Sequence, residues 1–415
     1  MFNFWKKNNK PPINKDISFQ RIDLRSSAEE LNSYSSEDTG SKSEGPELKN
    51  NLDGFPIVRA IARDKDQLLR GSKLRFMEDA QYNLQILRDS VPTSELITET
   101  ILLGNLAPKE VLIVYIGNIA NLSIVAEVKR RIKTIKAKTL YESSYIQRNI
   151  EDSTLSPFPQ VEATERPDVA VSALFQGRII IILDGSPNTL LAPCTFFDLM
   201  DTPDDAYTRW FITASFFRVA RYVMLLLAGC LPGFYIALLS YNPEMLPTRI
   251  LLLILNSREG TPFPIYFEVF LMMGIGEALR LMLIRSPSLL GSTVALFCGI
   301  TLVISGIFSN IIGPGLVIVV TLTFLSSFGI PDYDLRSSIR IIQFVTMIIS
   351  SFFGLFGFAL SFFLICIHLS TLKSFGIPYM APLATLEIDA WGHTLLRGNS
   401  KEMPIDDTYK PQDPR

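Results

Sequence analysis

One stretch of this chain constrains its fold more than any other: residues 286–331 contain no Asp, Glu, Lys or Arg over 46 positions. A buried helix of a soluble protein does not need so long an apolar run, whereas two crossings of a lipid bilayer do. Gly313, Pro314 and Gly315 divide the run, and such a cluster ends a helix and reverses the chain. The pattern predicts a helical hairpin inside a membrane.

Two further charge-free stretches, 222–243 and 341–372, contain 22 and 32 residues. At about 1.5 Å per residue, each is long enough to cross a hydrocarbon core of roughly 30 Å. The net charge of −2 and the 19% of charged residues would suit a soluble protein, but most Lys, Asp and Glu lie before residue 209. We therefore predict a multi-pass α-helical membrane domain over 209–385, followed by a polar C-terminal tail over 386–415.

The region before the membrane domain is predicted to be soluble. Residues 1–51 are rich in Ser, Asn, Glu and Lys and cannot bury enough apolar surface to fold, so we expect a disordered tail. The rest is expected to form a soluble α/β region of two small subdomains, 52–152 and 153–208. The first residues lack the apolar segment of a signal peptide, so we expect this region to stay in the cytoplasm.

Apolar runs place the main elements of the two subdomains. A buried strand at 111–116 feeds a helix at 122–135 in the first, and two β-like runs flank the turn residues 184–188 in the second, which predicts a β-hairpin. A proline-rich connector, residues 155–168, precedes the hairpin. Its last residue, Asp168, is expected to cap a helix over 169–176.

The helix at 122–135 is amphipathic, with one apolar face and four Lys or Arg residues on the remainder, and Lys136 and Lys138 follow it directly. Its basic surface either lies near anionic lipid or is simply solvated, and both interpretations stay open. No nucleic-acid-binding module accompanies it, so no nucleic-acid partner is predicted.

No cofactor or metal is predicted. The cysteines Cys194, Cys230, Cys298 and Cys366 are far apart, which favours reduced packing residues, and His368 and His393 are too few and too separated for a metal site. No nucleophile with its base and no glycine-rich phosphate loop is visible. An enzyme is therefore not expected.

Four prolines bracket the apolar stretch 250–255, which is too short for an ordinary span. We expect a re-entrant or interfacial piece there, because irregular backbone at membrane depth must be buried in protein or line a cavity. The candidate broken-helix or gate positions are Pro243, Glu244, Pro247, Arg258, Glu259, Pro262 and Pro264.

The next apolar helix, 265–284, carries the candidate polar positions of the membrane domain. Glu277 and Arg280 are spaced i, i+3 and can pair with each other. Glu268 has no basic neighbour on its own helix and is the first candidate for a pore-facing carboxylate, with interfacial placement or an intersubunit pair as alternatives.

Small residues mark candidate helix-packing interfaces. Gly291, Ala295 and Gly299 form a smooth strip that would let helices approach closely in lipid. Gly354 and Gly357 either do the same or supply a kink in the long segment 341–372. Each group is interpreted as a packing feature, with a subunit interface or a hinge as the alternative.

Three arginine clusters set the predicted topology. Positive-inside counting places all three on the cytoplasmic side, so that the chain crosses five times, or six if the final segment bends or 250–255 counts as a span. The clusters are Arg209, Arg218 and Arg221; Arg280 and Arg285; and Arg336 and Arg340.

Four sequence strings, in this order, resemble the A-subunit family of bacterial spore germinant receptors, the GerA type. They are TERPD at 164–168, PEMLPT at 243–248, SREGTPFP at 257–264 and HLSTLKSFGIPY at 368–379. The resemblance covers about residues 70–385. Within the first string, Glu165, Arg166 and Asp168 are candidates for holding the two subdomains together or for contacting a partner.

The resemblance implies a subunit of the spore inner membrane that works with a transporter-like, nutrient-binding B subunit and a lipoprotein C subunit. It also implies that A subunits form a homo-oligomer, contact membrane lipid and conduct ions when nutrients are sensed. A non-conducting scaffold in the same receptor is the alternative. A secondary transporter is a further one, although neither its usual span number nor an internal repeat is found.

Overall fold

The structure is a computed structural model that describes residues 74–202, 204–205, 208, 210–285, 288–383 and 409, without the side chains of 288–295. All of these belong to one compact unit, residues 60–415. The predicted disordered tail at 1–51 lies outside the described residues. So does the predicted tail at 386–415, apart from Tyr409.

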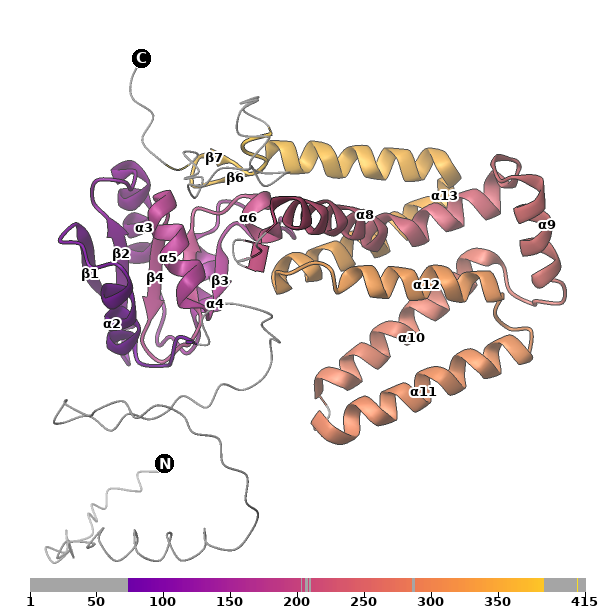
Figure 1. Cartoon of the computed structure of the whole chain (residues 1–415), viewed down its shortest axis with the longest axis horizontal. Coiled ribbons are helices and arrows are strands. Elements are labelled where there is room, and N and C mark those ends of the chain that lie inside the picture. The colour runs from indigo at the N-terminus through magenta and orange to yellow at the C-terminus, as the bar shows by residue number, and fades with distance from the viewer. Residues whose placement is uncertain are drawn as a thin grey trace, which may run out of the picture. The chain divides into compact units, whose positions relative to one another are not determined.

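A five-stranded antiparallel sheet in the order β1-β2-β4-β5-β3 forms the centre of the soluble part (Figure 1). Its central strands β2 and β4 are apolar and buried on both faces, as sheets covered by helices on two sides require. The strands are β1 Leu96–Leu103, β2 Lys109–Ile116, β3 Glu162–Thr164, β4 Ile179–Leu183 and β5 Thr189–Ala192.

Two helices cover each face of this sheet. Helices α3 (Leu122–Thr134) and α4 (Ser143–Ile150) pack against one set of alternating strand residues, which includes Ile113 and Ile181. Helices α2 (Ala80–Ser90) and α5 (Pro167–Gln176) pack against the other set. Period-two alternation along the strands therefore divides the interior into two hydrophobic cores.

The predicted elements are largely present, but the predicted division into two subdomains is wrong. The β4–β5 hairpin and helix α3 lie where expected. Strands from 52–152 and 153–208 nevertheless pair in one sheet, with Val111 opposite Leu183. The physical reason is that β2 needs a hydrogen-bonded neighbour on each side, and β4 supplies the second.

The predicted cap of helix α5 is also corrected. The helix begins at Pro167, whose fixed φ suits the first helical position, and Arg166 is the N-cap residue. Asp168 lies inside the first turn, and its carboxylate pairs with Arg166 at 2.7 Å.

The second half of the structure consists of helices (Figure 1). After the short α6, the helices α8 and α13 are the longest. The elements are α6 Phe196–Met200, α8 Phe211–Tyr241, η1 Pro243–Met245, α9 Thr248–Ser257, α10 Ile265–Arg285, α11 Ser288–Phe308, α12 Pro314–Ser327 and α13 Tyr333–Thr371, followed by a small hairpin of β6 Lys373–Ser374 and β7 Ile377–Pro378.

Two of the described helices, α8 and α13, are long and apolar enough to cross a membrane. The predicted reversal at Gly313 is present, because α11 ends at Phe308 and α12 begins at Pro314 with Gly313 as N-cap. The stretch 250–255 forms the ten-residue helix α9, in which no side chain is buried.

Helix α13 turns back on itself at Gly354, where the backbone has φ 61° and ψ −139°. The first part of the helix contacts the connector through Ser338, and the last part contacts it through His368. A β-carbon on Gly357 would lie 2.6 Å from the Ile349 carbonyl oxygen, so its absence permits the close turn. The long segment therefore consists of two arms, 333–353 and 355–371. The final segment is bent, as in the alternative prediction, and is not one straight helix.

Candidate functional site

The connector is held between the two ends of α13. Ser338, in the first arm, donates a hydrogen bond to the Pro157 carbonyl. At the end of the second arm, His368 Nε2 lies 2.9 Å from the Ser156 hydroxyl, and the Phe158 ring packs 6.0 Å from the His368 ring. One short segment of the soluble part therefore contacts both ends of a long apolar helix.

The β6–β7 hairpin extends this junction. Ser374 donates to the Gln160 carbonyl at 2.7 Å and accepts from the Cys194 N–H at 3.1 Å, and it is buried. Gln147, on α4, donates to Asp334 at the start of α13, 3.1 Å away. The polar groups of the two halves thus satisfy one another where they meet.

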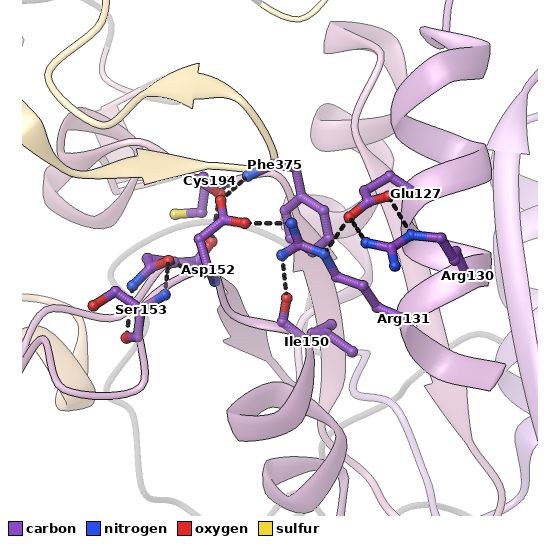
Figure 2. Close-up of polar contacts among 10 residues, drawn as sticks. Glu127, Arg130, Arg131, Ile150, Asp152, Ser153, Cys194 and Phe375 are labelled. Carbon is purple, nitrogen blue, oxygen red and sulfur yellow. Dashed lines mark hydrogen bonds and ion pairs between the residues drawn. The ribbon is translucent and has the colours of Figure 1, made fainter. Parts of the chain in front are cut away.

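Arg131 organises the neighbouring part of the junction (Figure 2). From helix α3, its guanidinium donates to Glu127 at 2.7 Å, to the Ile150 carbonyl at 2.6 Å and to Asp152. The other oxygen of Asp152 accepts the backbone N–H of Phe375 at 2.6 Å. The Asp152 carboxylate therefore bridges α3 and the tip of the β6–β7 hairpin, with one oxygen bound to each.

Phe375 occupies an unusual backbone conformation. Its φ is +49° and that of Gly376 is +88°, which gives the two-residue turn between β6 and β7 its left-handed form. A bulky residue in this region is strained by roughly 1–2 kcal/mol. The ring is only 7% exposed, joins the α3–α4 core and lies 4.5 Å from the Arg131 guanidinium. Burial and the cation–π contact offset the strain.

A cleft of about 660 Å³ opens beside these residues. Its walls come from α3, the chain after α4, the end of α13 and the β6–β7 hairpin, so both halves of the structure line it. The lining includes Glu127, Arg131, Asp152, His368, Lys373 and Phe375.

Glu151 places a titrating group at the same junction. Burial raises the pKa of its carboxyl to about 7, against the opposing hydrogen bond from the Gln160 backbone N–H, and the charge of Asp334 raises it further. This carboxyl therefore changes charge near neutral pH.

Glu268 is fully buried and paired, which differs from the pore-facing position expected of it. Both its oxygens accept from Arg258, each at 2.8 Å, and Arg258 also donates to the Phe263 carbonyl at 3.4 Å. A β-carbon on Gly313 would lie 3.1 Å from Arg258 Cγ, so the turn between α11 and α12 packs directly on the pair. The sequence did not reveal this partner because it comes from the loop after α9.

The other candidate gate positions lie in the segments just before and just after α9. Pro243 begins the single turn η1 and Pro247 is the N-cap of α9. The remainder are exposed residues of the same loops, namely Glu244, Glu259, Pro262 and Pro264.

The predicted pair of Glu277 and Arg280 is present, with Nη1 and Oε1 3.3 Å apart. Arg340, from α13, also approaches Glu277, at 3.5 Å. Arg280 further donates to Ser327 at 3.1 Å and lies 5.0 Å from the Phe324 ring.

Two of the remaining candidates, Gly299 and Glu165, make contacts within the chain. A β-carbon on Gly299 would lie 3.5 Å from Leu279, so this position faces α10. The surroundings of Gly291 and Ala295 lie outside the described residues. Glu165 pairs with Arg75 at 3.1 Å, which ties the chain before α2 to the start of α5.

The Arg131–Asp152–Phe375 group was not predicted. Its three members are far apart in sequence, and the left-handed turn carries Phe-Gly where Asn-Gly is the usual signal. The string HLSTLKSFGIPY, which contributed to the family resemblance, was the available indication of this region.

Together these features define a protein in which a one-sheet α/β part is attached to apolar helices through a polar junction. The chain belongs to the Bacillus/Clostridium GerA spore germination protein family, whose model matches residues 57–407.

Three relatives have similar levels of identity. Spore germination protein A1 of Bacillus subtilis (strain 168) is 36% identical over 84% of this chain and 72% of its own length. Uncharacterized membrane protein YfkQ of the same organism is 35% identical over 78% of this chain and 63% of its own length. Spore germination protein GerLA of Bacillus cereus is 35% identical over 80% of this chain and 67% of its own length.

A solved structure is also similar to this chain. It is the crystal structure of the N-terminal domain of the A subunit of the Bacillus megaterium spore germinant receptor GerK3. It is 39% identical, covers 30% of this chain and 98% of that domain, and has a TM-score of 0.25.

Proposed function

We propose that this chain is the A subunit of a spore germinant receptor in the spore inner membrane, with its sheet on the cytoplasmic side. Family membership and the apolar helices support this assignment. The sequence resemblance adds the expected partners, a nutrient-binding B subunit, a lipoprotein C subunit and further copies of A.

We further propose six crossings, namely α8, α10, α11, α12 and the two arms of α13. Three contacts support a far end away from the sheet: Tyr241, at the end of α8, packs on the Gly354 turn, and Arg258 packs on Gly313. The Tyr241 hydroxyl also donates a hydrogen bond to the Ser351 carbonyl. In this arrangement both arms of α13 begin or end beside the connector, and the sheet and the β6–β7 hairpin share one side.

The observation that carries the functional proposal is the attachment of the connector to both ends of α13. A change in the soluble part, passed on from the B subunit, moves the two arms, and the arms move the turn at Gly354. Packing of the helices then changes, and an ion path opens between copies of A.

The buried Arg258–Glu268 pair is the proposed far-side lock of the closed state. Breaking a buried pair by removing one partner costs several kcal/mol because a charge is left without its counterion. Loss of either residue should therefore destabilise the closed packing.

Cation flux in liposomes that contain the chain with its B and C subunits tests this function. Wild-type complex should conduct only with nutrient, and Glu268→Gln should conduct without it. Asp89→Asn, which changes an exposed carboxylate of α2 away from the helices, is the control and should behave as wild type. A correctly assembled complex without flux under any condition would instead support a scaffold that signals to a separate conductor.

A further inference from the structure

The polar cluster formed by Glu277, Arg280 and Arg340 has more positive than negative charge. Glu277 Oε1 lies 3.3 Å from Arg280 Nη1 and 3.5 Å from Arg340 Nε, so two guanidinium groups share one carboxylate.

The nearby acidic residues have other partners. Asp332 caps α13 by accepting the Leu335 N–H at 2.6 Å, and Asp334 accepts from Gln147. Within the described residues, both Glu277 Oε1 and Arg340 Nε are buried without a hydrogen bond of acceptable geometry. Among the described residues, this cluster is therefore satisfied only in part.

A positive charge in excess of the negative charge is costly among apolar helices, so an anion from outside would stabilise this cluster. The two arginine side chains are 14% and 22% exposed, so their outer nitrogens can reach one. The adjoining cavity, about 10 Å³, has room for one water but not for an anion, so the anion must bind at the surface.

The surroundings indicate which anion it is. Arg340 lies about 9 Å along the helix from Asp334, which accepts a hydrogen bond from Gln147 of α4, so the cluster is near the end of the helices that adjoins the soluble part, called here the sheet end. Next to Arg280 on α10, the side chains of Leu281 and Ile284 are 54% and 63% exposed. Cationic groups beside an exposed apolar surface match a phosphate headgroup joined to acyl chains.

We propose that Arg280 and Arg340 bind the phosphate of an anionic phospholipid at the sheet end of α10 and α13. Arginine suits this role because its planar group can donate two parallel hydrogen bonds to phosphate oxygens. The lipid would supply the negative charge that the helices lack. This inference rests on the membrane placement proposed above.

The test uses the full chain in nanodiscs of phosphatidylglycerol or of phosphatidylcholine. Wild-type protein should have a midpoint of thermal unfolding about 2–4 °C higher in phosphatidylglycerol, as expected for an added interaction of this kind. Native mass spectrometry should show phosphatidylglycerol retained after release from mixed nanodiscs.

Three variants make the test specific. The double variant Arg280→Gln/Arg340→Gln should lose both the shift and the retained lipid, whereas Arg340→Lys, which keeps the charge, should retain most of the shift. Arg88→Gln removes an exposed arginine from the last turn of α2 and is the matched control, with wild-type behaviour expected.

Several results would overturn the lipid site. They are equal midpoints in the two lipids, a phosphatidylglycerol preference that survives the double substitution, and full reproduction of the shift in phosphatidylcholine by millimolar inorganic phosphate. Carbonate extraction separates this inference from the placement on which it rests. Release of wild-type protein from membranes by carbonate would contradict the placement itself.

Discussion

At the scale of single residues, Phe375 shows how tertiary contacts stabilise a strained backbone conformation. Its left-handed backbone is unfavourable for an aromatic residue, yet Asp152 binds its N–H and Arg131 covers its ring. The contacts come from α3 and from the chain after α4. The tip of the β6–β7 hairpin is thus fixed to the soluble part by contacts that local sequence does not show.

Replacement of Phe375 by Ala and by Gly should give an unusual order of stability. Both variants lose the buried ring, which costs about 3–5 kcal/mol. Gly should be the more stable of the two by roughly 1 kcal/mol, because only Ala keeps the left-handed strain. Denaturant unfolding of the full chain in detergent measures the difference.

The same two substitutions at Phe158 provide the control for Phe375. Phe158 is also buried but is not among the residues with positive φ, so Ala should be favoured over Gly there by the usual margin. If Ala were the more stable replacement at both positions, the strain assigned to Phe375 would be absent.

Residue pairs could be predicted from the sequence only where helix geometry determined them. The spacing of Glu277 and Arg280 was enough to predict their contact. Glu268 was correctly recognised as lacking a partner on its own helix, but its partner Arg258 lies across a loop. Tertiary packing, which no local spacing encodes, selected that partner.

At the scale of elements, α13 depends on one glycine. The charge-free run over 341–372 predicted a helix, and Gly354 was noted as a kink or a packing position. The size of the turn could not be predicted, because it depends on the approach of Ile349 to Gly357 and of Tyr241 to Gly354. These are contacts between segments that the turn itself brings together.

Gly354→Ala should prevent normal folding of this element. Its φ and ψ are accessible essentially to glycine alone, and a β-carbon would lie 2.7 Å from Tyr241 Cγ. We expect loss of most monodisperse protein, measured by size-exclusion chromatography of the tagged chain. Gly274→Ala in α10, where nothing lies within 4 Å of the added carbon, should leave the yield unchanged. Equal yields of the two variants would contradict the tight turn.

At the scale of the whole molecule, the sequence predicted a soluble α/β part followed by helices, and the structure contains both. The division of the soluble part was wrong because sheet pairing joins strands separated by about 70 residues, as Val111 and Leu183 are. Such pairing is set by non-local contacts, which hydrophobic periodicity does not report.

Five and six crossings differ in where they place Lys373. Six crossings put it on the cytoplasmic side and put Asn256, in the exposed helix α9, on the opposite side. In a chain whose cysteines are replaced, Asn256→Cys should react with a membrane-impermeant maleimide in intact protoplasts. Lys373→Cys should react only after permeabilisation, and its labelling in intact cells would favour five crossings.

The turn at Gly354 also makes α13 a pair of helical arms that share one pivot, Gly354, at the end away from the sheet. Ser338 lies about 24 Å along the first arm from Gly354, so a rotation of only about 5° at the pivot displaces it by about 2 Å. A displacement of that size is enough to break the hydrogen bond between Ser338 and the Pro157 carbonyl while His368 remains in contact with Ser156. In the proposed mechanism, a small rotation near the pivot would therefore make or break a discrete contact at the connector.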